Sequence, residues 1–267
     1  MQLNQILERT VAISREAGAF IQQERKSFDI GKVERKGVND LVSYVDREVE
    51  QFVVDRLHEL LPEAGFITEE GTSEAKGEIY DWIIDPLDGT TNFIHGLPVY
   101  SVSIGLKKQE EIVLGVVFEV NQNECFSAIK GGGAFCNGIP IEVSETQELS
   151  SGLIATGFPH NGQDQISGYL GVLKSLIENS RGFRRLGSAA VDLCYVAAGR
   201  VDGYFQHKLH PYDVAGGSII VEEAAGKVTD FSGAGNYLFG GEIVASNGAL
   251  HQELLGQAKL INTKQTP

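Results

Sequence analysis

The chain has 267 residues, enough for one large domain or two closely packed subdomains with a buried core. Hydrophobic residues make up 42% and charged residues 22%, which are ordinary globular values and exclude wholesale disorder. The formal net charge of −14 disfavours nucleic acid as a main partner, because phosphate contacts need clustered lysine and arginine.

The N-terminal segment is amphipathic and carries Glu8, Arg9, Arg15 and Glu16, so it lacks the apolar region of a secretory signal. No stretch is long and apolar enough to span a bilayer. The three cysteines are odd in number and show no CxxC spacing, which indicates neither a disulfide framework nor a zinc site. We expect a cytoplasmic protein that does not contact membranes.

The first half of the chain begins with helical periodicity and then changes to strands. Two amphipathic helices are expected, over about residues 3–21 and 45–60, and Pro62 ends the second. The stretch Lys36-Gly37-Val38-Asn39-Asp40 between them is polar and turn-like. Apolar strands separated by polar breaks are expected next, at residues 80–85, 101–106, 112–120 and 124–129. Asn137-Gly138 is a strong hairpin-turn signal.

The second half of the chain alternates more regularly between the two kinds of element. Its expected strands cover residues 152–158, 201–205, 227–231 and 242–246. Its expected helices cover residues 165–177, 188–199, 213–226 and 249–260. The fold class is therefore mixed α+β and α/β, with helices layered against two sheets. We divide the chain into an N-terminal α+β subdomain, residues 1–145, and a C-terminal α/β subdomain, residues 146–267.

The segment "WIIDPLDGTTNF", residues 82–93, drives two carboxylates to the end of a hydrophobic strand. Pro86 cannot donate to a sheet ladder, so the strand is expected to end there. Asp85, Asp88 and the carbonyl of Leu87 then form an oxygen-only donor set, which suits Mg²⁺ better than zinc. The residues that follow, 89–91, open a helical turn whose free amides attract an anion. The alternative is purely structural: Asp85 terminates a strand and Asp88 caps a helix.

Further acids stand at the ends of other elements. "FITEEG" places Glu69 and Glu70 after a short apolar strand, where we expect at least one of them to be solvated. Asp213 and Asp46 each begin a helix, and a helix-start acid is the ordinary role for both. Together these positions indicate a common site.

With these residues assembled, the chain resembles the inositol monophosphatase family of Mg²⁺-dependent phosphomonoesterases. Residues 82–93 match its first signature. "YDVAGG", residues 212–217, is a looser form of the second, with Tyr212 where the family usually has tryptophan. "KGVNDLVSYVDREVE", "TEEG" and "FRRLGSAAVDLCYVAAGRVDGYF" match further blocks, and the resemblance covers about residues 3–255. It implies a layered αβαβα sandwich of the inositol monophosphatase and fructose-1,6-bisphosphatase type.

The resemblance also implies roles for individual residues. Two to three Mg²⁺ ions per site would be held by Glu69, Asp85, the Leu87 carbonyl, Asp88 and Asp213. The implied catalytic residues are Thr90, Asp46 and Glu69, with Thr90 and Asp46 orienting the attacking water. The implied substrate-binding residues are Gly89, Thr90, Gly187, Ser188, Ala189, Gln206 and Asp213. A lithium-sensitive homodimer is the usual form.

The expected activity is hydrolysis of a small phosphomonoester of a polyol or sugar by metal-activated water, which releases inorganic phosphate. Gln206 stands where many inositol phosphatases carry a glutamate that binds a ring hydroxyl, so inositol as the main substrate is open. Arg184, Arg185 and Lys208 are candidates for holding a second anion. The alternatives are therefore phosphatases for fructose 1,6-bisphosphate, histidinol phosphate or 3′-phosphoadenosine 5′-phosphate, or a regulatory role through a protein partner. His207 and His210 are expected to be surface or packing residues.

Overall fold

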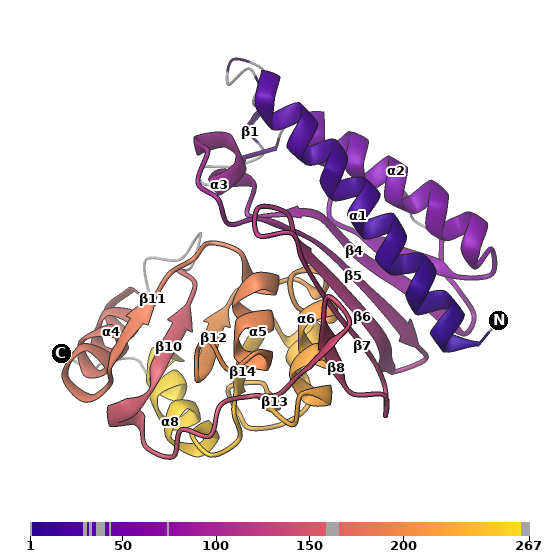
Figure 1. Ribbon diagram of the computed structural model, residues 1–267. Coiled ribbons are helices and arrows are strands. Elements are labelled where there is room, and N and C mark those ends of the chain that lie inside the picture. Colours follow the sequence, from indigo (N-terminus) through magenta and orange to yellow (C-terminus); the bar gives the residue numbers. More distant parts are fainter. Residues whose placement is uncertain are drawn as a thin grey trace.

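The protein is built from five alternating layers of helices and sheets (Figure 1). The computed structural model describes residues 2–28, 31, 34–35, 41–42, 44–73, 75–158 and 166–262. Helices α1 and α2 cover one sheet, α5 and α6 lie between the two sheets, and α4 and α8 cover the second sheet. This arrangement confirms the predicted αβαβα sandwich. The predicted turn at residues 36–40 lies outside the described residues.

The six predicted helices fall close to their expected positions, as α1, α2, α4, α5, α6 and α8, whereas the short helix α7 was not predicted. The bounds of the helices are α1 Leu3–Ser27, α2 Tyr44–Leu60, α3 Thr90–His95, α4 Ile166–Asn179, α5 Ala189–Ala197, α6 Pro211–Glu223, α7 Tyr237–Gly240 and α8 His251–Asn262, with a short 3-10 helix η2 at Leu149–Ser151. Within the described part of the chain, no helix combines the length and the apolar character needed to cross a membrane.

The larger sheet has seven strands in sequential order, from β3 to β9. They are β3 Gly65–Thr68, β4 Tyr80–Asp88, β5 Ser101–Lys108, β6 Glu111–Glu119, β7 Glu124–Ile129, β8 Ala134–Cys136 and β9 Ile139–Ile141. Strands β4 to β7 are nearly continuous apolar runs, because helices bury both faces of the sheet. In β4, Trp82 and Ile84 belong to the core under α1 and α2, whereas Ile83 belongs to the core on the opposite face.

The end of β4 differs from the prediction in a way that matters for the site. The strand continues past Pro86 to Asp88, and its register shifts there: Asp85 pairs with Ser103 and Asp88 with Ser101. Pro86 and Leu87 therefore lie opposite the single residue Val102, a bulge that accommodates proline, which has no N–H to donate. Residues three apart on a regular strand point to opposite faces. The bulge removes this alternation and lets both aspartates face one pocket.

The hairpin between β8 and β9 confirms the turn prediction. Asn137 has φ 50° and Gly138 has φ 78°, so both central residues adopt the left-handed conformation that a two-residue hairpin loop needs.

The second sheet has the strand order β11-β10-β12-β14-β13 and mixes parallel with antiparallel pairs. Its strands are β10 Leu153–Thr156, β11 Gly182–Arg184, β12 Gly203–His207, β13 Lys227–Thr229 and β14 Glu242–Ser246. The edge strand β11 was not predicted, and neither was the two-stranded pair of β1 Glu34–Arg35 and β2 Leu41–Val42. Such short strands carry little periodic signal.

Helix α6 packs unusually close to the seven-stranded sheet, over a pair of glycines. Gly105 and Gly115 are register partners on β5 and β6. A Cβ atom at Gly105 would lie 2.8 Å from the Cβ of Ala215, and one at Gly115 would lie 2.3 Å from the carbonyl oxygen of Gly216. These glycines therefore set the height of α6, whose first turn carries Asp213, above the sheet.

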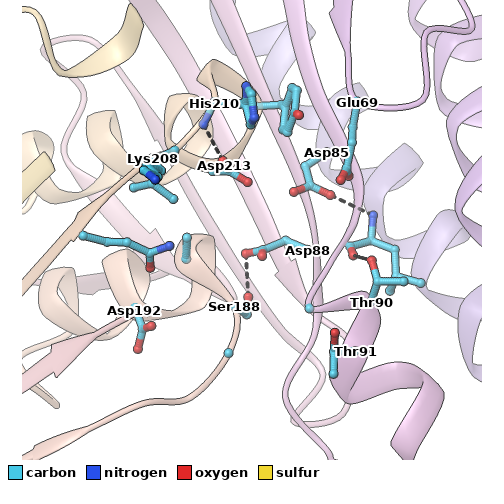
Figure 2. A pocket seen from close by; sticks show the side chains of 18 of the residues that line it. Glu69, Asp85, Asp88, Thr90, Thr91, Ser188, Asp192, Lys208, His210 and Asp213 are labelled. Atoms are coloured by element: carbon cyan, nitrogen blue, oxygen red, sulfur yellow. Dashed lines mark hydrogen bonds between the residues drawn. The ribbon is translucent and has the colours of Figure 1, made fainter. Parts of the chain in front are cut away.

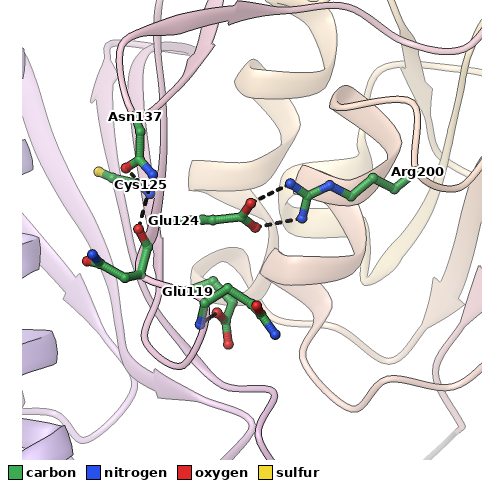
Figure 3. Close-up of polar contacts among 7 residues, drawn as sticks. Glu119, Glu124, Cys125, Asn137 and Arg200 are labelled. Carbon is green, nitrogen blue, oxygen red and sulfur yellow. Dashed lines mark hydrogen bonds and ion pairs between the residues drawn. The ribbon is translucent and has the colours of Figure 1, made fainter.

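A salt bridge joins the seven-stranded sheet to the loop after α5 (Figure 3). The guanidinium of Arg200 donates two hydrogen bonds to the carboxylate of Glu124, one of them 2.6 Å long. The same guanidinium lies 4.7 Å from the ring centroid of Tyr195. This bidentate geometry fixes α5 relative to the sheet as well as neutralising charge.

Candidate functional site

A cavity of about 380 Å³ opens where the end of β4 faces the first turns of α5 and α6 (Figure 2). All the residues predicted to bind metal or substrate line it. They are Glu69, Asp85, Leu87, Asp88, Gly89, Thr90, Gly187, Ser188, Ala189, Gln206 and Asp213. These residues come from distant parts of the chain, so the fold gathers them into one place. Asp46, the remaining predicted residue, contacts the cavity through Thr90.

Asp85 and Glu69 form one acidic wall of the cavity (Figure 2). Asp85 is 2% exposed, and its Oδ1 accepts a hydrogen bond of 3.0 Å from the Leu87 amide across the bulge. Burial raises the pKa of Glu69 to about 8. Burial, followed by the charge of Glu69, raises the pKa of Asp85 well above its usual range. Both carboxyl groups therefore lie where the ionised form is costly without a cation.

Asp88 joins β4 to the start of α5. Its Oδ2 accepts hydrogen bonds of 2.6 Å from the Ser188 hydroxyl and 2.7 Å from the Ala190 amide. Ser188 is the N-cap of α5, so Asp88 satisfies free donors at that helix terminus. Burial raises the pKa of Asp88 to about 6, although these hydrogen bonds oppose the shift. Asp88 is not itself an N-cap, since Gly89 caps the helix that follows it, but it binds the capped end of α5 and also lines the cavity.

Asp213 is the third residue of α6 and faces Asp85 and Asp88 across the cavity (Figure 2). Its Oδ2 accepts a hydrogen bond of 2.5 Å from the His210 amide. Burial and the charge of Asp88 raise the pKa of Asp213 to about 7. The helix-start role expected for this residue and its position in the site therefore coexist.

Thr90 and Asp46 form a hydrogen-bonded pair at the edge of the cavity. The Thr90 hydroxyl lies 2.9 Å from Oδ1 of Asp46 and 3.1 Å from the carbonyl oxygen of Leu87, and it can donate to either. Asp46 is 1% exposed, on the first turn of α2. Because the hydroxyl proton is directed to one of these acceptors, the oxygen lone pairs of Thr90 remain to orient a water molecule.

One helical turn after Asp46, Glu50 supports the loop that carries Glu69. Glu50 is fully buried, and its two oxygens accept hydrogen bonds of 2.7 Å from the Glu70 amide and 2.8 Å from the Thr72 amide. The side chain of Glu70 is only 3% exposed and lies 4.0 Å from the Arg47 guanidinium. The expectation that Glu69 or Glu70 would be solvated is wrong. Contacts with Glu50 and Arg47 hold this loop against helix α2.

The residues of this wall fit a divalent cation. Their donors are carboxylate and carbonyl oxygens, the set that Mg²⁺ prefers. Oε2 of Glu69 is buried and has no hydrogen-bond partner among the described residues. Within the described part of the chain, no three acidic, histidine or cysteine side chains form a group arranged to hold a metal ion.

The opposite side of the cavity is formed by the segment before α5 and by β12. Gly187 has φ 98°, a conformation that favours glycine, and Asn92 ties this segment to α3 by donating 2.8 Å hydrogen bonds to the carbonyls of Val99 and Leu186. Gln206 is 7% exposed, and its Oε1 accepts a 2.7 Å hydrogen bond from the Tyr204 hydroxyl. The amide N–H groups of Gln206 can donate to a ligand, and its oxygen keeps a second lone pair that can accept.

Two of the three basic residues predicted as candidates for holding a second anion, Arg185 and Lys208, line the cavity. His210, expected to be a surface or packing residue, also lines it, and its ring stacks on that of Tyr212 with centroids 5.1 Å apart. Arg184 does not line it; its guanidinium donates to the carbonyl of Phe183.

His207 and Asp192 are two further residues whose surroundings bear on the predictions. His207 is buried and stacks on the ring of Tyr169, as expected of a packing residue. Asp192, on α5, was not considered, although a lone acid in the apolar run "SAAVDLCYVAAG" is a sequence signal that could have identified it.

The layered αβαβα fold is that of solved inositol monophosphatase structures. The profile of the Inositol monophosphatase family matches residues 2–263, and the chain belongs to this family.

The relatives cover nearly the whole chain. The Nus factor SuhB of Escherichia coli is 39% identical over 258 residues, which are 96% of this chain and 97% of that protein. The crystal structure of the extragenic suppressor protein suhB from Bartonella henselae has a TM-score of 0.90 at 37% identity, covering 96% of this chain and 98% of that one. An IMPase from Thermotoga maritima has a TM-score of 0.88 at 37% identity, with the same coverage.

Proposed function

We propose that this protein is a Mg²⁺-dependent phosphomonoesterase that hydrolyses small polyol or sugar phosphates. The observation that supports this most is the gathering of Glu69, Asp85, Asp88 and Asp213 in one cavity beside the Thr90–Asp46 pair. The cavity is narrow enough to surround a small ester and polar enough to exclude an apolar ligand as its natural occupant.

The residues that would hold the ions follow the family pattern. Glu69, Asp85 and the Leu87 carbonyl would bind one Mg²⁺; Asp85, Asp88 and Asp213 would bind a second, and a third would lie near Glu69. When bound, the ions supply charge neutralisation and a water of lowered pKa, which the slow uncatalysed hydrolysis of phosphate monoesters requires. The Ser188 and Ala190 contacts hold Asp88 in orientation for this role.

Thr90 and Asp46 would orient the attacking water. A threonine hydroxyl is too weak a base to remove a proton from water by itself. With its proton directed to Asp46, Thr90 accepts a hydrogen bond from the water, and Asp46 is placed to take up a proton passed through the hydroxyl. Glu69, beside Asp85 on the acidic wall, completes the proposed catalytic set.

The phosphate and the alcohol would occupy different parts of the cavity. The amides of Gly89 and Thr90 would bind phosphate oxygens, and Gly187, Ser188, Ala189, Gln206 and Asp213 would line the alcohol side. A side chain at Gly187 would project against Asn92, since a Cβ atom there would lie 2.7 Å from its amide nitrogen. The glycine thus lets this segment pack close to Asn92 and Arg185 at the edge of the cavity.

A phosphate-release assay on a phosphomonoester panel, with and without Mg²⁺, tests the proposal. We expect turnover only with Mg²⁺, loss of Mg²⁺ binding in Asp85→Asn, and normal Mg²⁺ affinity with low turnover in Thr90→Ala. Lithium should inhibit, as in the family. The absence of metal-dependent turnover on every ester would refute the function, and unchanged Mg²⁺ affinity in Asp85→Asn would refute the shared ligand.

Bisphosphate or amine substrates are the alternatives within the same chemistry. Arg185 and Lys208 line the cavity and could hold a second anion, whereas Arg184 lies outside it. Comparing kcat/KM for inositol 1-phosphate, fructose 1,6-bisphosphate, histidinol phosphate and 3′-phosphoadenosine 5′-phosphate separates these substrates.

A second candidate function is regulation through a protein partner, which the name Nus factor SuhB of its relatives favours. An Asp88→Asn variant that loses hydrolysis but retains the cellular role would support this function. Loss of both together would favour the phosphatase.

We also propose a homodimer, as the resemblance implies. Helix α4 exposes Ile166, Leu170 and Ile177 at helical spacing, next to the edge strand β11. Light scattering of the wild type and of Leu170→Glu tests both the dimer and this face.

A further inference from the structure

Asp192 is a buried carboxyl group on the wall of the cavity farther from Glu69 and Asp85 (Figure 2). The residue is 1% exposed, and its Oδ1 is enclosed without a hydrogen-bond partner among the described residues. Buried polar atoms in folded proteins are nearly always paired, so an exception needs an explanation. For Asp192, the explanation lies in the part of the cavity that this residue lines.

The ordinary structural roles of a helix acid do not account for Asp192. The N-cap of α5 is Ser188, whose oxygen accepts a 3.3 Å hydrogen bond from the Val191 amide. Asp192 follows one turn later on the same face and is surrounded by the apolar residues of the helix. Among the described residues it makes no salt bridge; Arg185 is close enough only to oppose the rise in its pKa that burial causes.

The position of Asp192 relative to the acidic wall indicates what it could bind. Asp88 and Ser188 mark where the metal and phosphate side meets α5, and Asp192 lies a turn beyond them, on the alcohol side. Gln206 lines the same cavity, and its amide N–H groups can donate to a ligand while its Oε1 accepts a hydrogen bond from Tyr204. A carboxyl acceptor and an amide donor together complement hydroxyl groups, which both donate and accept.

We infer that Asp192 binds a hydroxyl group of the alcohol portion of the substrate, and that Asp192 and Gln206 together select polyol phosphates over esters of plain alcohols. This inference rests on the proposed phosphatase function. A buried site built to bind hydroxyl groups penalises analogues that lack them, because its own polar groups then stay unpaired.

The test compares two esters of the same ring size, inositol 1-phosphate and cyclohexyl phosphate, on the Mg²⁺-loaded enzyme. For Asp192→Ala we expect kcat/KM for inositol 1-phosphate to fall about ten- to a hundredfold, with a change below about threefold for cyclohexyl phosphate. Asp192→Asn, which has the same shape and keeps an acceptor oxygen, should lose selectivity in the same direction but less. Asp55→Ala, an exposed aspartate on α2, is the matched control.

The outcomes separate the inference from the function on which it rests. Equal losses on both esters, or no loss on either, would overturn the hydroxyl contact while leaving the phosphatase intact. If the wild type hydrolyses neither ester nor any other with Mg²⁺, the phosphatase proposal fails first. Should Asp192→Ala not fold, the ratio of the two rates in Asp192→Asn decides.

Discussion

Replacing Glu50 by glutamine tests how the loop carrying Glu69 is held in place. Glu50 is fully buried and accepts hydrogen bonds from the amides of Glu70 and Thr72. A hydrogen bond to a charged group contributes about 1.5–3 kcal/mol. Glutamine keeps one acceptor oxygen but turns its NH₂ group toward the other amide, so one bond is lost and two donors face each other. We expect the loop to lose about 2–3 kcal/mol of local stability.

Hydrogen exchange measures this loss where it occurs. Since about 1.4 kcal/mol corresponds to a factor of ten, the amides of Glu70 and Thr72 should exchange about 30- to 150-fold faster in Glu50→Gln. Mg²⁺ affinity, measured by calorimetry, should weaken about ten- to a hundredfold, as is typical when the support of a metal ligand is removed. Glu48→Gln, an exposed position on α2, should change neither. Unchanged exchange at both amides would refute the reasoning.

Three further predictions concern backbone strain and pH. Gly187→Ala should raise KM and lower the melting temperature, because φ 98° is strained for alanine and its Cβ would meet Asn92; unaltered kinetics would contradict this. At the proposed ligands Asp213 and Glu69, whose pKa values are about 7 and about 8, protons compete with Mg²⁺. Mg²⁺ affinity measured by calorimetry should therefore rise from about pH 6 to about pH 9. An affinity that does not change with pH would count against this competition. Burial lowers the pKa of His251 to about 4 from its usual 6.5, so below pH 6.5 the unfolded chain binds a proton that the folded protein excludes. The free energy of unfolding, measured by urea denaturation, should therefore keep the full contribution of His251 above pH 6.5 and fall toward pH 4. The fall should be less steep in His251→Gln.

The sequence predicted those parts of the fold that depend on local signals. The apolar runs of β4 to β7 and the Asn137-Gly138 turn carry their structure in neighbouring residues, and the structure confirms them. The predicted end of β4 at Pro86 was wrong, because a proline at a bulge looks the same in sequence as a proline at a strand end. Strand β11 has three residues and only an edge position, too little for a periodic pattern.

Some residues of the candidate site could likewise be predicted from the sequence, and others could not. Glu69, Asp85 and Asp213 were predicted because their motifs match a family, and the structure places all three in one cavity. Glu50 gave no comparable signal, and the signal for Asp192 was only its place as a lone acid in an apolar run; both side chains are buried by the tertiary fold. Which buried acid receives backbone donors and which remains unpaired is decided by tertiary packing.

The cavity lies between the seven-stranded sheet and the first turns of α5 and α6. Asp88 belongs to the larger sheet and reaches across to α5, whereas Asp213 belongs to α6 in the second half of the chain. A cation held by Asp88 and Asp213, as proposed above, would link the larger sheet directly to α6. Binding of the ion would then also stabilise the packing of α6 on that sheet.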